Sequence, residues 1–309
     1  MSSADATTHL RALARRVVDS YLARGEPRAA LLVGSAATGD ADAYSDLDLI
    51  VYFDRVPSPE VVAETPRELG ATWYRSKAWS DGSGEPDEHG YGERYEVGGI
   101  ECQVGLASVG AVERLIARVV VDLDLTEERL KIMSGLHEGL ALHGENLIEQ
   151  WRERSAYTDE LRRATIEKRW KFFPWWYFQE RLRTRDATAW RHEVLAQSVY
   201  GIVGVLAALN GIYFSSFEFK RASRFVSRFE VAPPDLAARL EALFSSDERA
   251  AIEELERLVA ETRALVAERV PDLDLPLEWG EEPTPPGARE SPWDAPGSQS
   301  SPFGIQKSG

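Results

Sequence analysis

The apolar positions of the first 55 residues change from helical spacing to strand spacing. From Ala6 to Arg24 they recur every three or four residues, which predicts an amphipathic helix that ends near Gly25 and Pro27. The short apolar run Ala29–Val33 then stops at a Gly-Ser pair, which is typical of a buried strand that turns directly into a loop or a helix. Leu47–Phe53 is rich in branched and aromatic residues and predicts the next strand.

The segment after the second predicted strand contains many glycine and proline residues, which interrupt regular structure. Their density between Asp81 and Gly92 predicts a mobile surface loop without regular structure. The strand-like runs Arg94–Val97 and Ile100–Leu106 flank the pair Gly98-Gly99, a pattern that predicts an antiparallel hairpin. Helical spacing then resumes at Val109 and continues, with interruptions, to about Val270.

These patterns predict an α+β protein with two domains. Residues 1–155 are expected to form a mixed sheet with helices, and residues 156–279 an all-helical domain. Residues 280–309 are rich in Pro, Gly, Ser and Glu and contain few core-forming side chains, so we predict a disordered tail.

The composition of the chain limits the kinds of ligand it is expected to bind and its expected cellular location. The formal net charge of -15 disfavours a nucleic-acid partner, because binding to a phosphate backbone needs clustered Lys and Arg. The surplus acid suits a neutral or cationic ligand, or is only a solvated surface. The single cysteine, Cys102, excludes a disulfide within the chain. With no signal-like start and no stretch near eighteen uninterrupted apolar residues, we expect a cytoplasmic protein without a membrane span.

The candidate site residues lie at the end of the first predicted strand and at the start of the second. Because side chains alternate along a strand, Asp46 and Asp48 point to the same face. Two acids placed together repel, and a cation between them resolves the repulsion. Oxygen ligands suit Mg²⁺, and two ions about 4 Å apart can bridge an attacking oxygen and a leaving phosphate. Backbone N–H groups at Gly34-Ser35 are suited to hold an anion such as a triphosphate.

A third acid would complete such a metal site. Glu101 is the candidate, since it lies on the predicted hairpin strand with Cys102 facing the opposite way and Gln103 repeating its direction. The alternative for Glu101 is an exposed strand acid paired with a Lys or Arg.

Gly34-Ser35, a spacer of about ten residues, Asp46-Leu47-Asp48 and a later carboxylate together resemble the DNA polymerase beta-like nucleotidyltransferase superfamily. The strings around Gly34 and Asp46 are most similar to its small-molecule branch, which includes aminoglycoside and lincosamide nucleotidyltransferases. Two features depart from the pattern: many relatives carry a basic residue where this chain has Thr38, and more often an Asp where it has Glu101.

The resemblance implies a nucleotidyltransferase fold and an enzyme with two Mg²⁺ ions as cofactors, one held by Asp46, Asp48 and Glu101 and the other by Asp46 and Asp48. It implies transfer of a nucleoside monophosphate, AMP from ATP by default, to a hydroxyl of a small molecule, with release of pyrophosphate. The helical domain is expected to close over the nucleotide. The acidic balance of the chain would favour a cationic acceptor such as an aminoglycoside.

By the same likeness, Lys220 is expected to bind the nucleotide together with Gly34 and Ser35; the alternative is a surface lysine with its stem on apolar neighbours. Two other functions remain open. One is nucleotidylation of a protein or an RNA, as in toxin–antitoxin pairs, and the other is a non-catalytic nucleotide-binding relative. Oligomeric state is not encoded in these patterns.

Overall fold

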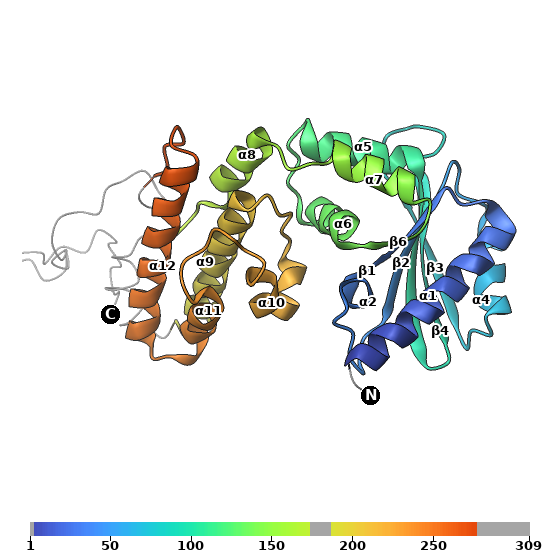
Figure 1. Cartoon of the computed structure of the whole chain (residues 1–309), viewed down its shortest axis with the longest axis horizontal. Coiled ribbons are helices and arrows are strands. Elements are labelled where there is room, and N and C mark those ends of the chain that lie inside the picture. The colour runs from blue at the N-terminus through green and yellow to red at the C-terminus, as the bar shows by residue number, and fades with distance from the viewer. Residues whose placement is uncertain (1–2, 174–186, 277–309) are drawn as a thin grey trace, which may run out of the picture. The chain divides into compact units, whose positions relative to one another are not determined.

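A computed structural model describes residues 3–173 and 187–276 (Figure 1), so the predicted tail at 280–309 lies outside the described residues. The chain forms two compact units: Met1–Ile166 with Leu206–Glu230, and Glu167–Val205 with Val231–Gly309. This division differs from the predicted boundary after residue 155, because the chain returns to the first unit at Leu206. The Tyr213 hydroxyl, for example, donates to the Ser155 carbonyl at 2.9 Å.

A six-stranded mixed sheet forms the centre of the first unit, in the order β3-β4-β5-β2-β1-β6. β2 and β5 run parallel and the other neighbours run antiparallel, which agrees with the predicted α+β class and its nucleotidyltransferase-like fold. The strands are β1 (Ala29–Val33), β2 (Leu47–Phe53), β3 (Tyr74–Ser80), β4 (His89–Val97), β5 (Ile100–Ser108) and β6 (Leu140–His143). The helices of this unit begin with α1 (Ser3–Gly25), α2 (Gly34–Thr38), α3 (Pro59–Val62), α4 (Glu64–Glu68), α5 (Val109–Val120), α6 (Glu127–Glu138) and α7 (Glu145–Arg154).

Helices pack on both faces of the sheet (Figure 1). On one face, Leu47, Leu49 and Val51 of β2 belong to the same buried cluster as the apolar side of α1. On the other, Tyr52 packs with helices α5 to α7 and meets the buried Trp151 ring edge-on, with centroids 4.9 Å apart. Because the face alternates along β2, Asp46 and Asp48 share the face of Tyr52.

The predicted hairpin is confirmed, with Val97 opposite Ile100 across the turn. Gly98 and Gly99 have φ values of 61° and 81°, and two consecutive positive φ values are what a tight two-residue hairpin turn requires. β4 begins already at His89, so regular structure extends into the segment predicted to be a loop. The remaining loop is anchored, because Arg114 pairs with Asp81 at 2.8 Å and with Asp87 at 3.0 Å.

Strands β3 and β6 were not predicted, since neither shows the alternation of a half-buried strand. β3 is an edge strand, and all its residues except one are exposed.

The C-terminal part is helical, as predicted. Its elements are α8 (Asp159–Arg169), α9 (Thr188–Leu209), the short 3₁₀ helix η2 (Ser216–Arg221), α10 (Ala222–Val226), α11 (Leu236–Ser245) and α12 (Glu248–Arg269). Within the described residues, α9 is the one helix long and apolar enough to cross a membrane, and 72% of its apolar window is buried. Such burial is typical of a core helix.

Candidate active site

The two predicted aspartates lie together where β2 begins. The Gln103 amide donates to Asp46 Oδ2 at 2.5 Å, and Asp48 lies directly opposite Gln103 in the β2–β5 register. Burial and the charge of Asp46 raise the pKa of Asp48 to about 6, although Lys131, Lys220 and Arg94 act in the opposite direction. The protein's own cations therefore do not fully compensate this pair of acids.

Gly34 is the residue that brings the β1–α2 turn onto these acids. Its φ is +69°, and a Cβ built on it would lie 2.8 Å from Asp48 Oδ2. Any larger side chain would therefore be strained and would collide with the carboxylate. Ser35 follows in the first turn of α2, so the predicted pair Gly34-Ser35 lies beside the predicted pair Asp46 and Asp48.

Glu101 lies on the same face but is engaged elsewhere. Continuing the β2–β5 register by one position from Leu47–Cys102 places Glu101 opposite Asp46. Its Oε1, however, is 3.8 Å from Arg94 Nε, the pairing expected of an exposed strand acid. Within the described part of the chain, no group of three or more His, Cys, Asp or Glu side chains is gathered to hold a metal ion. The role of Glu101 as a metal ligand thus stays a prediction.

The residues present fit a divalent cation in their chemistry. Asp46 and Asp48 offer carboxylate oxygens on one face, and the raised pKa of Asp48 marks a place where positive charge is lacking. Glu101 supplies a third carboxylate on the adjacent strand. Oxygen donors of this kind are those that Mg²⁺ prefers.

Two lysines approach the acids from the helices. Lys220 of η2, which the sequence singled out, and Lys131 of α6, which it did not, both lower the pKa of Asp48 through their charge. Their ammonium groups lie 5.8 Å and 4.0 Å, respectively, from the ring centroid of Phe217. No motif surrounds Lys131, so only the packing of α6 reveals it. The sequence already placed Gln103 on the face of Glu101, but its hydrogen bond to Asp46 was not predicted.

The segment that carries Lys220 is tied to the loop that precedes β2. Arg221 is 3.1 Å from Asp42 Oδ2, and Arg224 donates to the Thr38 carbonyl at 3.1 Å and pairs with Asp40. These contacts hold η2 and α10 against the α2 end of the site.

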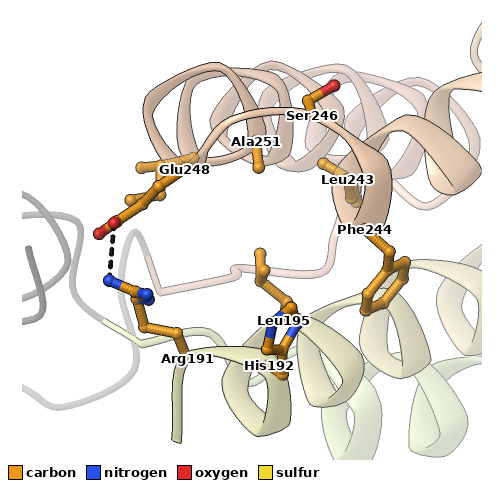
Figure 2. Close-up of a pocket in the computed structure, with 9 residues that line it drawn as sticks. Arg191, His192, Leu195, Leu243, Phe244, Ser246, Glu248 and Ala251 are labelled. Atoms are coloured by element: carbon orange, nitrogen blue, oxygen red, sulfur yellow. Dashed lines mark hydrogen bonds and ion pairs between the residues drawn. The ribbon is translucent and has the colours of Figure 1, made fainter. Parts of the chain in front are cut away.

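A separate cavity of about 160 Å³ lies within the second unit, between α9, α11 and α12. Figure 2 shows Arg191 and Glu248 paired at one side of it, at 2.6 Å, and Phe244 at the other. Its one acid is already paired with an arginine. This cavity therefore lacks the uncompensated carboxylates that mark the candidate active site.

The raised pKa of Asp48 predicts an unusual pH dependence of stability. The folded protein binds the Asp48 proton more tightly than the unfolded chain does, so this residue favours folding at low pH and loses that contribution as pH rises through about 6. A pKa that moves from 3.8 to about 6 corresponds to a free energy on the order of 2–3 kcal/mol. Urea unfolding without added metal should show wild type gaining stability over Asp48→Asn between pH 7 and pH 4. If the free energies of unfolding of the two proteins changed equally with pH, the raised pKa of Asp48 would be wrong.

Part of the first unit is similar to a known protein family. Residues 13–87 match the family model described as "Nucleotidyltransferase domain", so this part of the chain is similar to such domains. The matched range contains Gly34, Asp46 and Asp48 and stops before Glu101. No curated protein was found to match the sequence.

Among solved structures, a nucleotidyltransferase-like protein from Exiguobacterium sibiricum 255-15 is similar, at 13% identity. The alignment covers 84% of this chain and 77% of that one, with a TM-score of 0.32. A likeness at this TM-score carries no argument about the site.

Proposed function

We propose that the protein is a magnesium-dependent nucleotidyltransferase that moves a nucleoside monophosphate, AMP from ATP, to a hydroxyl group of a small molecule and releases pyrophosphate. The observation that carries the proposal is the pair Asp46 and Asp48, which lies against the Gly34 turn within the residues that match the nucleotidyltransferase domain.

Each residue of the site has a role in this proposal. Asp46 and Asp48 would hold Mg²⁺, with Glu101 as the third candidate ligand. The bound cation supplies electrostatic stabilisation to the charge that develops on the triphosphate. Gln103 orients Asp46 through its 2.5 Å hydrogen bond.

The triphosphate is bound by other groups. The backbone N–H groups at Gly34 and Ser35 donate to the phosphate oxygens, which can come close because Gly34 has no side chain. Lys131 and Lys220 add positive charge beside Asp48, where the phosphates would lie.

One experiment separates the candidate functions. Purified protein is incubated with Mg²⁺, labelled ATP and a metabolite extract, and all products are analysed by mass spectrometry. A nucleotidylated metabolite supports the proposal. A nucleotidylated protein or RNA supports the macromolecular alternative. Binding of ATP without any transfer supports a non-catalytic relative.

Lys220→Ala and Lys131→Ala are each expected to raise KM for ATP by about tenfold, because a charge-assisted contact with phosphate contributes on the order of 1.5 kcal/mol. kcat should change less, since the contact is made in both the ground and transition states. Lys171→Ala is the matched control, because Lys171 is an exposed lysine of the second unit. Steady-state kinetics of pyrophosphate release measure the effect. An unchanged KM in both site variants would remove the lysines from the nucleotide site.

A further inference from the structure

A single row of side chains runs across four strands from the candidate active site to the edge of the sheet. Asp48 lies opposite Gln103, Gln103 opposite Arg94, and Arg94 opposite Arg75. Residues directly opposite each other in a sheet share a face. Arg75 and Arg94 therefore lie on the same face as the carboxylates.

This part of the face is open. Arg75, Lys77 and Arg94 are exposed, and Lys77 lies opposite Gly92, which has no side chain. A Cβ built on Gly92 would meet nothing within 4 Å, and one on Gly105 would meet only β2 at 3.7 Å or more. The glycines thus leave a low floor beside Lys77, in the row next to the one that holds Arg75, Arg94, Gln103 and Asp48.

The charges on this open face are poorly compensated. Arg75 and Arg94 are like charges directly opposite each other, which is a destabilising arrangement, and Glu101 compensates Arg94 from 3.8 Å. Among the described residues, the side chains of Arg75 and Lys77 form no ion pair or hydrogen bond. The chain as a whole has an excess of acid, with a formal charge of -15. Two unpaired cations on one face are therefore not explained by a general surplus of basic residues.

Acids do occur on the same face, one row further along. Glu96 lies opposite Glu101. Glu96 accepts from the Thr72 hydroxyl at 2.9 Å, and Glu101 pairs with Arg94 at 3.8 Å. Neither acid forms an ion pair with Arg75 or Lys77. Arg94 also donates to Gln103 Oε1 at 3.1 Å, so its guanidinium is connected through Gln103 to Asp46.

We propose that this open face, with Arg75, Lys77 and Arg94, binds a phosphate group of the acceptor, so that the acceptor is a small phosphorylated molecule with a free hydroxyl, such as a sugar or polyol phosphate. The inference rests on the proposed function, which places the reacting hydroxyl beside Asp46 and Asp48. Neighbouring strands lie about 4.8 Å apart, so Arg94 is about 10 Å from Asp48 across the sheet, a span that a phosphorylated sugar can cover.

The transfer balances without a further reactant. The acceptor hydroxyl oxygen forms a bond to the α-phosphorus of ATP, and the bond from that phosphorus to the bridging oxygen breaks. Pyrophosphate leaves with that oxygen and its electron pair, and the hydroxyl proton passes to solvent. A nucleic-acid acceptor fits the face less well, since a phosphate backbone needs many clustered cations and this face offers three.

The first test measures phosphate binding at the open face and does not depend on catalysis. Phenylglyoxal modifies exposed arginines, and a bound anion protects them. Full-length protein saturated with Mg²⁺ and a non-hydrolysable ATP analogue is treated with phenylglyoxal with and without inorganic phosphate, and modification is followed by peptide mass spectrometry. Phosphate is expected to slow modification of Arg75 several-fold and to leave Arg15, an exposed arginine of α1, unchanged. Equal rates at Arg75 with and without phosphate would overturn the proposal.

The second test asks whether the acceptor must carry a phosphate group. A pool of sugar and polyol phosphates is compared with the same pool after phosphatase treatment, and pyrophosphate release is measured with Mg²⁺ and ATP. Arg75→Gln with Lys77→Gln is expected to lower kcat/KM for the phosphorylated pool by about tenfold or more, with KM for ATP unchanged. Arg15→Gln with Arg16→Gln removes the same charge from α1 and should act as wild type.

Equal turnover of the two pools, a double variant equal to wild type, or RNA as the sole acceptor would each contradict the proposal. Protection of Arg75 by phosphate without release from either pool would uphold the anion site and instead contradict the proposed transfer.

Discussion

Asp48→Asn is expected to lower nucleotidyl transfer by at least about a hundredfold, as the loss of a central electrostatic group typically does. Asp46→Asn should have a similar effect. The melting temperature should hold or rise at neutral pH, because the substitution removes a half-buried charge whose pKa is raised by burial and by its neighbouring acid. Loss of activity together with retained stability separates a functional residue from a structural one.

Pyrophosphate release with Mg²⁺ and ATP, using the acceptor identified from the extract, measures the first quantity, and thermal unfolding measures the second. Asp122→Asn is the matched control. Asp122 belongs to another Asp-x-Asp string, Asp122-Leu123-Asp124, and is exposed. It should retain full activity. If both site variants kept more than about a tenth of wild-type activity, the assignment of the carboxylates to catalysis would be wrong.

The second large effect is expected at Gly34. Gly34→Ala should reduce activity by about a hundredfold, because the new Cβ would lie 2.8 Å from Asp48 Oδ2 and either the turn or the carboxylate must move. The substitution should also cost about 1–2 kcal/mol of stability, since Gly34 has a positive φ.

Gly70→Ala separates these two effects. Gly70 has a φ of +73°, close to the +69° of Gly34, but a Cβ there would meet nothing within 4 Å. It should lose a similar amount of stability and keep its activity. Urea unfolding and steady-state kinetics on both variants measure the pair. Equal activity of the two variants would show that contact with Asp48 is unimportant.

Much of the fold and part of the site were predictable from local patterns. β1 and β2 occupy the predicted residues, and the Gly98-Gly99 turn joins the predicted hairpin. The proximity of Asp46 and Asp48 follows from strand alternation alone, which is a local property of the backbone.

Contacts between segments far apart in the chain were harder to predict from the sequence. The strand β3 has exposed residues on both faces and so carries no alternating pattern, and it is a strand only because β4 offers it hydrogen bonds. The same holds for the return of the chain to the first unit at Leu206. Neither feature has a counterpart in the spacing of apolar residues.

The sequence by itself determined the carboxylate pair, the glycine turn and the two strands that flank them, because turn chemistry and side-chain alternation act over a few residues. Only the tertiary structure decided which groups surround that pair. It placed Gln103 against Asp46, paired Glu101 with Arg94, and brought the charge of Lys131 to Asp48. The reason is that strand register and helix packing are set by contacts between residues far apart in the chain, whose joint effect no local pattern records.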